Sequence, residues 1–152
     1  MTYQRILVPV DGSAASNLGL REAMRLAKGG RARLLLVHVV DQHYALMGGP
    51  EVALTLDDLA PLLKQAGRRV LDKAEALVKR ARLACSTALL ETFTGPAADP
   101  IVRQARKWRA DLVVIGTHGR RGVRRLVMGS DAEQVVRNSP VPVLLVRARQ
   151  RR

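Results

Sequence analysis

Short apolar runs alternate with longer amphipathic segments along the whole chain. The apolar runs cover residues 5–10, 34–40, 112–115 and 141–146, and a less apolar run covers residues 86–94. Near-continuous apolar runs of this length are typical of strands that are buried on both faces of a sheet. We therefore predict five strands, and the weaker apolar character of residues 86–94 favours an edge position for that strand.

Between these runs, apolar residues recur at the spacing of amphipathic helices. The first predicted helix covers residues 13–28, with Gly29-Gly30 as its stop, and the second runs from Asp57 or Asp58 to Arg82. A third is expected to open with Asp99 as N-cap and Pro100 as first helical residue. The last begins at Ser130, where Ser130 and Glu133 form a capping-box pattern, and ends at Asn138-Ser139-Pro140. Residues 41–55 are predicted to form a surface loop.

This order of strands and helices predicts an α/β fold with a single open five-stranded parallel sheet and helices on both faces, as in Rossmann-like proteins. Ligands of such sheets bind outside the carboxyl ends of the strands, where the strand order reverses. Asp11 follows the first strand and Gly116 ends the fourth, so the order 3-2-1-4-5 would bring both to one place. We expect that order, with one domain over residues 1–147 and a basic C-terminal tail over residues 148–152.

The composition is typical of a globular domain, with 47% hydrophobic and 26% charged residues. No apolar run approaches the roughly 18 residues that a membrane span needs, and the first residues lack the layout of a signal peptide. Cys85 is the only cysteine, so the sequence contains neither a disulfide framework nor a cysteine cluster for a metal. We expect a cytoplasmic protein that has no membrane partner.

The net charge of +13 attracts anions such as nucleotides, nucleic acids or acidic lipid surfaces. Only 3% of the residues are aromatic, whereas proteins that bind single strands usually stack bases on aromatic side chains. Binding to nucleic acid is therefore an alternative that the sequence permits but does not favour.

The most specific signal is Gly116-Thr117-His118-Gly119, followed after nine residues by Gly129-Ser130. Glycines let a backbone approach a ligand closely, and the start of the last helix presents unpaired N–H groups and a positive dipole end. Such an arrangement binds phosphate. Any one glycine could be a turn residue, and Ser130 caps a helix with or without a ligand. Asp11 could likewise be a turn residue that bonds its own backbone.

The other polar residues of this motif have simpler explanations beside the functional one. His118 is a candidate ligand-binding residue, but a histidine without a paired carboxylate or cysteine is more typical of a loop. Arg120, Arg121, Arg124 and Arg125 are typical of a solvated basic loop, although guanidinium groups could also close over phosphates. Asp131 suits a helix dipole but repels phosphate at short range.

Taken together, these motifs resemble the universal stress protein family, in its nucleotide-binding branch. The resemblance rests on Val8-Pro9-Val10-Asp11-Gly12-Ser13, on the G-x-x-G-x9-G-[S/T] pattern of residues 116–130, and on the ending at residues 139–146. It covers nearly the whole chain. It implies an adenine nucleotide alpha hydrolase-like fold, a dimer, and ATP with Mg²⁺ as the ligand.

The same resemblance assigns roles to individual residues. It implies that the ribose and phosphates are held by Gly116, Gly119, Gly129 and Ser130. Asp11 would contact the nucleoside side and could help to position Mg²⁺. Pro9, Val10 and Val39 would border the adenine, with the main chain of Val39 reading its edge.

The function that we expect is an ATP-binding stress-response module in which hydrolysis is slow or absent. The chain has no P-loop, and its glycine motif has no lysine that could reach the β- and γ-phosphates. No set of nucleophile, base and orienting residue is evident. The alternative from another class is a partner-binding module without nucleotide. In either case the apolar final strand, at a sheet edge, predicts a homodimer through Val141 to Val146. A stress-response module also implies a protein partner, which the sequence does not identify.

Overall fold

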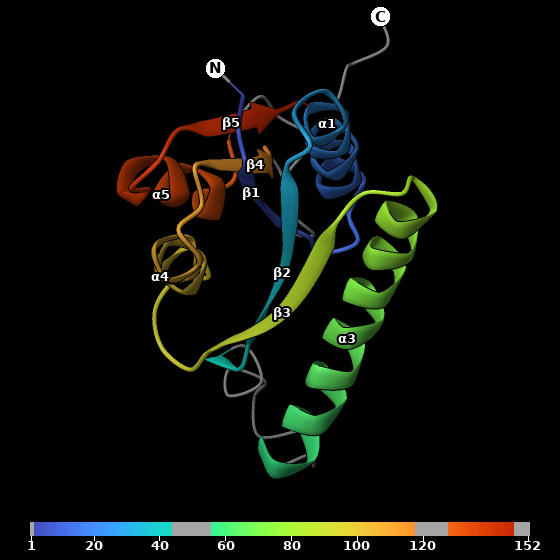
Figure 1. The fold of residues 1–152 in the computed structure, drawn as a ribbon. Coiled ribbons are helices and arrows are strands. Elements are labelled where there is room, and N and C mark those ends of the chain that lie inside the picture. The colour runs from blue at the N-terminus through green and yellow to red at the C-terminus, as the bar shows by residue number, and fades with distance from the viewer. Residues whose placement is uncertain (1, 44–55, 118–127, 148–152) are drawn as a thin grey trace, which may run out of the picture.

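Five parallel strands form the centre of the computed structural model, which describes residues 2–43, 56–117 and 128–147 (Figure 1). The strands are β1 (Arg5–Pro9), β2 (Arg33–Asp41), β3 (Cys85–Thr92), β4 (Leu112–Gly116) and β5 (Val143–Val146). Their order in the sheet is β3-β2-β1-β4-β5, and each neighbouring pair is parallel. The predicted fold class and strand order are confirmed, and β3 is an edge strand as expected.

Helices cover both faces of the sheet (Figure 1). They are α1 (Ala14–Gly30), α3 (Leu56–Arg80), α4 (Ala98–Trp108) and α5 (Ser130–Asn138). The helices α1 and α3 pack on one face, whereas α4 and α5 pack on the other. Parallel neighbours require such crossover helices. Because each crossover is right-handed, the helices lie on one face before the direction of the strand order reverses and on the opposite face after it.

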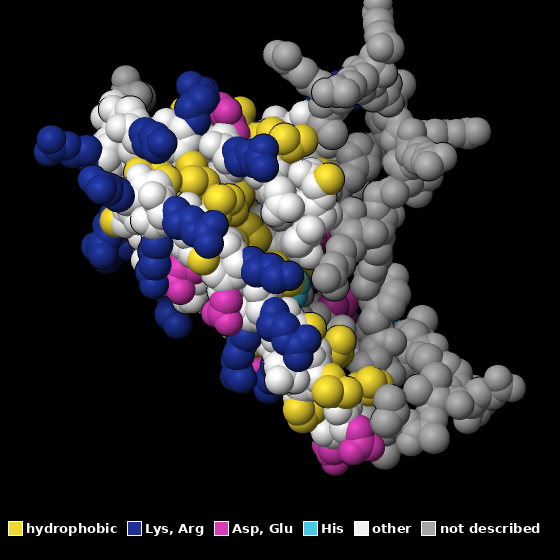
Figure 2. Space-filling model, turned by 90° about the vertical axis from the view of Figure 1, so that its right-hand side faces the viewer, with side chains coloured by type: hydrophobic (Ala, Val, Ile, Leu, Met, Phe, Trp, Pro, Cys, Tyr) yellow, Lys and Arg dark blue, Asp and Glu magenta, His cyan; other side chains and the backbone are white. Residues whose placement is uncertain are grey.

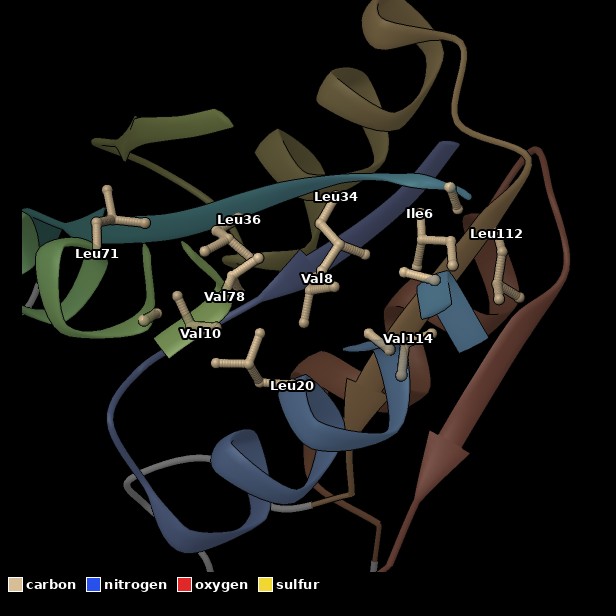
Figure 3. Packing of buried hydrophobic residues seen from close by; sticks show 14 residues of the cluster. Ile6, Val8, Val10, Leu20, Leu34, Leu36, Leu71, Val78, Leu112 and Val114 are labelled. Atoms are coloured by element: carbon tan, nitrogen blue, oxygen red, sulfur yellow. The ribbon is translucent and has the colours of Figure 1, made fainter. Parts of the chain in front are cut away.

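Each face of the sheet has its own apolar cluster, because successive side chains of a strand point to opposite faces. Under α1 and α3, Ile6, Val8 and Leu36 lie in one cluster with Leu20 and Val78 (Figure 3). The strand residues between them point to the opposite face and pack under α4 and α5. This second cluster contains Leu7, Leu35, Val37, Val113 and Ile115 from the strands, with Ile101 and Val135 from the helices. Burial on both faces explains why these strands read as continuous apolar runs rather than as alternating ones.

Several predicted helix boundaries were wrong. The helix α1 continues through Gly29 and Gly30, and its stop is Arg31, which has a left-handed φ of 55° and donates its N–H to the Ala27 carbonyl. The helix α4 begins at Ala98, with Ala97 as N-cap and no side-chain cap, so Asp99 and Pro100 lie inside its first turn. The Asp99 N–H already donates to the Pro96 carbonyl at 3.1 Å, which shows that the turn starts earlier than the sequence indicated.

The last strand begins at Val143 rather than at Val141. Ser139 holds the preceding residues in a turn, since its hydroxyl donates to the Val141 carbonyl at 2.7 Å and accepts from the Val141 N–H at 3.3 Å. Of the predicted loop 41–55, Asp41 ends β2, and residues 44–55 lie outside the described residues, as does the tail 148–152.

Basic side chains are spread over the outer surfaces of α1 and α3 (Figure 2). The exposed ones are Arg21, Arg25, Lys28, Arg68, Arg69, Lys73, Lys79 and Arg80. Two of them form ion pairs within their helix, Arg25 with Glu22 and Lys79 with Glu75. None of the helices in the described parts of the chain is long and apolar enough to cross a membrane.

Candidate functional site

Three residues form a closed ring of hydrogen bonds where β1 leads into α1. The Ser13 N–H donates to Asp11 Oδ1 at 2.8 Å, the Ser16 N–H donates to Ser13 Oγ at 3.2 Å, and the Asp11 N–H donates to Ser16 Oγ at 3.0 Å. Ser13 is therefore the N-cap of α1. Each of the three residues donates its main-chain N–H and accepts a hydrogen bond with its side chain. The ring therefore fixes the half-buried Asp11 at the carboxyl end of β1.

Gly12 makes this ring possible, because its φ of +80° lies in the left-handed region that glycine adopts without strain. The simpler interpretation of Asp11, as a turn residue bonded to its own backbone, is thus confirmed by the Ser13 contact. Its contact with a ligand stays a prediction.

Gly116, at the carboxyl end of β4, lies directly against the first turn of α1. A β-carbon at Gly116 would lie 2.5 Å from the Ala15 carbonyl oxygen and 2.9 Å from the Ser16 nitrogen. Close contact between the strand and the helix therefore requires a glycine here whether or not a ligand is present. Ser16 is the common neighbour of Asp11 and Gly116, so the structure brings these two predicted residues together.

A hydrogen bond joins the two described ends of the glycine motif. The Gly129 N–H donates to the Thr117 carbonyl at 2.8 Å, and the Thr117 N–H donates to the Val146 carbonyl of β5 at 3.0 Å. The start of α5 is thereby tied to the carboxyl ends of β4 and β5. Gly129 and Ser130 lie at the same edge of the sheet as Asp11 and Gly116.

The predicted capping box of α5 is wrong. Gly129 is the N-cap, with an extended ψ of 144°, and Ser130 is the first helical residue, so the Ser130 hydroxyl is not in a capping position. The Glu133 N–H donates to the Gly129 carbonyl at 3.0 Å, as expected of an ordinary first helical turn. The Glu133 side chain pairs with Arg137 at 2.9 Å, one turn further along the helix.

The two helices that begin at this edge differ in their caps. The start of α1 is capped by the Ser13 side chain, whereas no side-chain hydrogen bond caps α5. The N–H groups of Ser130 and Ala132 precede the first intrahelical bond of α5. With the positive end of the helix dipole, these groups form a favourable environment for an anion.

The residues expected to border a base lie on the neighbouring strands. Val10 is buried, and Pro9 and Val39 are half-buried. The β1–β2 register ends at the Pro9–Val37 pair, and the Val10 N–H makes the next bond, to the Val37 carbonyl at 2.8 Å. Since alternate residues of a parallel strand face the same neighbour, the main-chain groups of Val39 point to this side beyond the end of β1.

Some predicted residues cannot be placed. His118, Gly119 and the four arginines Arg120, Arg121, Arg124 and Arg125 lie outside the described residues. Three residues that the sequence analysis did not single out contribute to the site, namely Ser16, His38 and Thr117. For Ser16, the signal was a serine three residues after the N-cap Ser13. For His38, it was a polar residue within the apolar run 34–40.

Comparison with known proteins identifies the family. Residues 2–147 match the model of the universal stress protein family. The chain is similar to a universal stress protein of Methanocaldococcus jannaschii, at 34% identity over 95% of this chain and 82% of that protein. A crystal structure of a universal stress protein family member from Burkholderia pseudomallei superimposes with a TM-score of 0.77, at 34% identity over 96% of this chain and 97% of that chain.

A third similarity concerns a structure with a ligand. The universal stress protein from Archaeoglobus fulgidus in complex with dAMP has a TM-score of 0.66 and 25% identity, over 96% of this chain and 99% of that chain. The fold, the strand order and the family match agree with each other, and the chain belongs to the universal stress protein family.

Proposed function

We propose that this universal stress protein binds ATP with Mg²⁺ at the carboxyl edge of the sheet and acts as a nucleotide-dependent regulatory module. The observation that carries the proposal is the start of α5. Its N-cap is a glycine without a side-chain cap, and the Thr117–Gly129 hydrogen bond fixes it beside Gly116. An anion held there would complete the hydrogen bonding of the first turn, as a capping side chain does in other helices. The dAMP-bound relative supports an adenine nucleotide as that anion.

The remaining predicted residues fit the other parts of a nucleotide. In this proposal Gly119, Gly129 and Ser130 hold the phosphates, with Gly116 beside the ribose. Asp11, fixed by its ring of hydrogen bonds, contacts the ribose hydroxyls. Pro9, Val10 and the main chain of Val39 border the adenine. His118 stays a candidate of the same loop.

In this proposal the magnesium ion arrives with the nucleotide rather than being held by the protein alone. Within residues 2–43, 56–117 and 128–147, no group of three or more His, Cys, Asp or Glu is placed to hold a metal. Magnesium usually keeps several waters and binds through one or two carboxylates together with substrate phosphates. Asp11 is the carboxylate in the proposed position, and the phosphates would supply the other ligands.

We expect hydrolysis of the bound ATP to be slow or absent. Fast phosphoryl transfer needs a positioned metal, a base or orienting group for the nucleophile, and a cation over the transferred phosphate. Among the described residues at this edge, Asp11 is the carboxylate that accepts a main-chain hydrogen bond, and this bond positions it at the end of β1. Regulation would then follow from a bound state that binds a partner protein differently.

A homodimer through the final strand completes the proposal. β5 is an edge strand, and its residues Val143 to Val146 are half-buried. Pro142 and Val146 direct their carbonyls to β4, so the main-chain groups of Val143 and Leu145 face the open edge. A second copy can pair with that edge and cover its apolar side chains.

Calorimetric titration of nucleotide-stripped protein tests the function. Mg·ATP should bind saturably with one site per chain, and adenosine and inorganic tripolyphosphate should each bind more weakly. Absence of ATP binding would reject the proposal and favour the partner-binding module. Binding of an oligonucleotide with a steep salt dependence and no preference for adenine would favour the nucleic-acid alternative.

A further inference from the structure

The imidazole of His38 forms a hydrogen bond with a main-chain carbonyl just beyond the end of β1. His38 lies in β2, and its Nδ1 is 2.7 Å from the Val10 carbonyl oxygen. A carbonyl oxygen can only accept, so Nδ1 carries the proton and donates. This side-chain bond links β2 to the residue that follows β1.

The same carbonyl is the next acceptor in the β1–β2 ladder. The Arg33 N–H donates to the Gln4 carbonyl at 2.9 Å, which fixes the spacing of the β2 donors along β1. Steps of two residues along both strands bring the Val39 N–H opposite the Val10 carbonyl. The described register instead ends at Pro9–Val37, and the Val10 carbonyl is bonded to His38.

The fold makes room for this histidine. Gly67 is a buried glycine in the middle of α3, where glycine costs about 1 kcal/mol relative to alanine. A β-carbon at Gly67 would lie 2.7 Å from His38 Cδ2 and 2.8 Å from Leu89 Cδ1. The glycine at this position therefore leaves the space that the His38 ring occupies between α3 and the sheet.

We propose that His38 is a positioning residue for base recognition: by holding the Val10 carbonyl, it keeps the Val39 N–H and carbonyl open to the edge of an adenine. An adenine edge offers one ring-nitrogen acceptor beside one amino donor, which matches one N–H and one carbonyl of a single residue. The inference rests on the proposed nucleotide site. In this proposal a residue outside the glycine motif controls the selectivity of the site for adenine over other bases.

A pair of nearly isosteric substitutions separates this role from simple packing. His38→Asn keeps an N–H donor at the same number of bonds from the backbone as Nδ1, whereas His38→Leu has the same branched shape without a donor. His38→Phe fills the ring volume without a donor and guards against a packing defect in the leucine variant. Thermal unfolding of all three shows whether each is folded before binding is measured.

Titrations with Mg·ATP and with tripolyphosphate, together with amide exchange at Val39, form the test. Without the His38 donor, we expect the Val10 carbonyl to turn toward β2 and accept from the Val39 N–H, which would lengthen the ladder by one bond. His38→Leu and His38→Phe should therefore bind ATP about tenfold more weakly, the effect of about one net hydrogen bond. Their binding of tripolyphosphate should be unchanged, and Val39 should exchange more slowly than in the wild type. His38→Asn should bind ATP within about threefold of the wild type, less than the cost of one hydrogen bond.

The outcomes distinguish the two proposals. If the wild type binds no ATP, the proposed function fails and this role fails with it. If the wild type binds ATP and all three variants bind ATP as tightly as the wild type does, His38 has no positioning role, while the proposed function stands. An equal loss of ATP and tripolyphosphate affinity in the leucine and phenylalanine variants would show a structural defect and would also overturn the role.

Discussion

Gly116 and Ala15 touch backbone to backbone, since a β-carbon on Gly116 would lie 2.5 Å from the Ala15 carbonyl oxygen. The end of β4 and the first turn of α1 are held in this contact, and α1 also carries the ring that fixes Asp11. The first glycine of the motif thus has a packing function that is independent of any ligand.

Gly116→Ala should destabilise the protein by about 2–3 kcal/mol, because neither backbone can move without disturbing the sheet or the helix. Urea denaturation, followed by the fluorescence of the single Trp108, measures the free energy of unfolding. Gly29→Ala is the matched control, since nothing lies within 4 Å of a β-carbon there. It should raise stability by about 0.5–1 kcal/mol through helix propensity. Equal effects of the two substitutions would contradict the packing argument.

The architecture could be predicted from sequence because each buried strand is a near-continuous apolar run and each helix has a periodic one. The strand order 3-2-1-4-5 was expected because it would bring Asp11 and Gly116 to one place, although the sequence alone does not require that order. Helix ends were less predictable. Ser130 and Asp99 have the side chains of N-caps, but neither residue is one. At α5 the extended backbone of Gly129 makes that residue the N-cap. At α4 the turn begins earlier, since the Asp99 N–H already donates to the Pro96 carbonyl.

For the candidate site, the sequence singled out the motif glycines and Asp11, and their ligand contacts stay a prediction. It did not indicate the contacts that position Asp11 and Gly116. The bond between His38 and Val10 joins residues 28 positions apart, and no local pattern encodes it. The packing role of Gly67 could not be predicted from the sequence either, since it depends on how α3 lies over β2. Such contacts depend on tertiary packing, which sequence periodicity does not specify.

Ser16→Ala should loosen the end of β1. The substitution removes the acceptor of the Asp11 N–H, and Ser16 is only 5% exposed, so water replaces the lost hydroxyl poorly. The expected loss of stability is about 1–2 kcal/mol, with faster amide exchange at Asp11. Asn17→Ala, at an exposed position in the same turn, is the control and should leave both quantities nearly unchanged. Unaltered exchange at Asp11 in Ser16→Ala would show that the ring does not hold this residue.

Gly129→Asp should move nucleotide affinity and stability in opposite directions. The backbone at Gly129, with φ of −58° and ψ of 144°, is that of an ordinary N-cap, so an aspartate there can cap α5. The free protein should gain a few tenths of a kcal/mol, about the usual gain over a glycine cap. ATP affinity should fall at least tenfold, because the carboxylate occupies the phosphate position.

The control for this variant is Asn138→Asp, which adds the same charge at the other end of α5. It should leave ATP affinity within about twofold, since the charge is far from the phosphates and screened by salt. Calorimetry measures both affinities. Undiminished ATP binding by Gly129→Asp would place the phosphates elsewhere.

Cys85 should react with alkylating reagents only at raised pH. Burial raises the pKa of its thiol, and the nearby Glu75 carboxylate raises it further, while Lys79 opposes them. The neutral thiol is favoured in the folded state, so its contribution to stability is present below the pKa of the unfolded chain and is lost as pH rises through the folded pKa. The pH at half-maximal iodoacetamide rate should lie above the value of about 8.5 of a free cysteine.

Glu75→Gln should lower that pH, because it removes the carboxylate and leaves the Lys79 charge without its partner at 2.9 Å. Glu22→Gln removes a carboxylate paired with Arg25 in another helix and should leave the Cys85 profile unchanged. A profile for Cys85 that coincides with that of a free peptide thiol would show that burial does not control its reactivity.

Leu145→Pro should convert the proposed dimer into a folded monomer. The Leu145 N–H faces the open edge of β5, and proline is tolerated at such outward positions because no ladder bond is lost. Leu144→Pro is the contrasting variant, since its N–H faces β4 within the Val114–Leu144 pair, and its loss should destabilise the fold itself. Light scattering should then give half the wild-type mass for Leu145→Pro, with the circular dichroism of the wild type. A dimer that persists in this variant would show that the two copies join through another surface and that β5 does not form the interface.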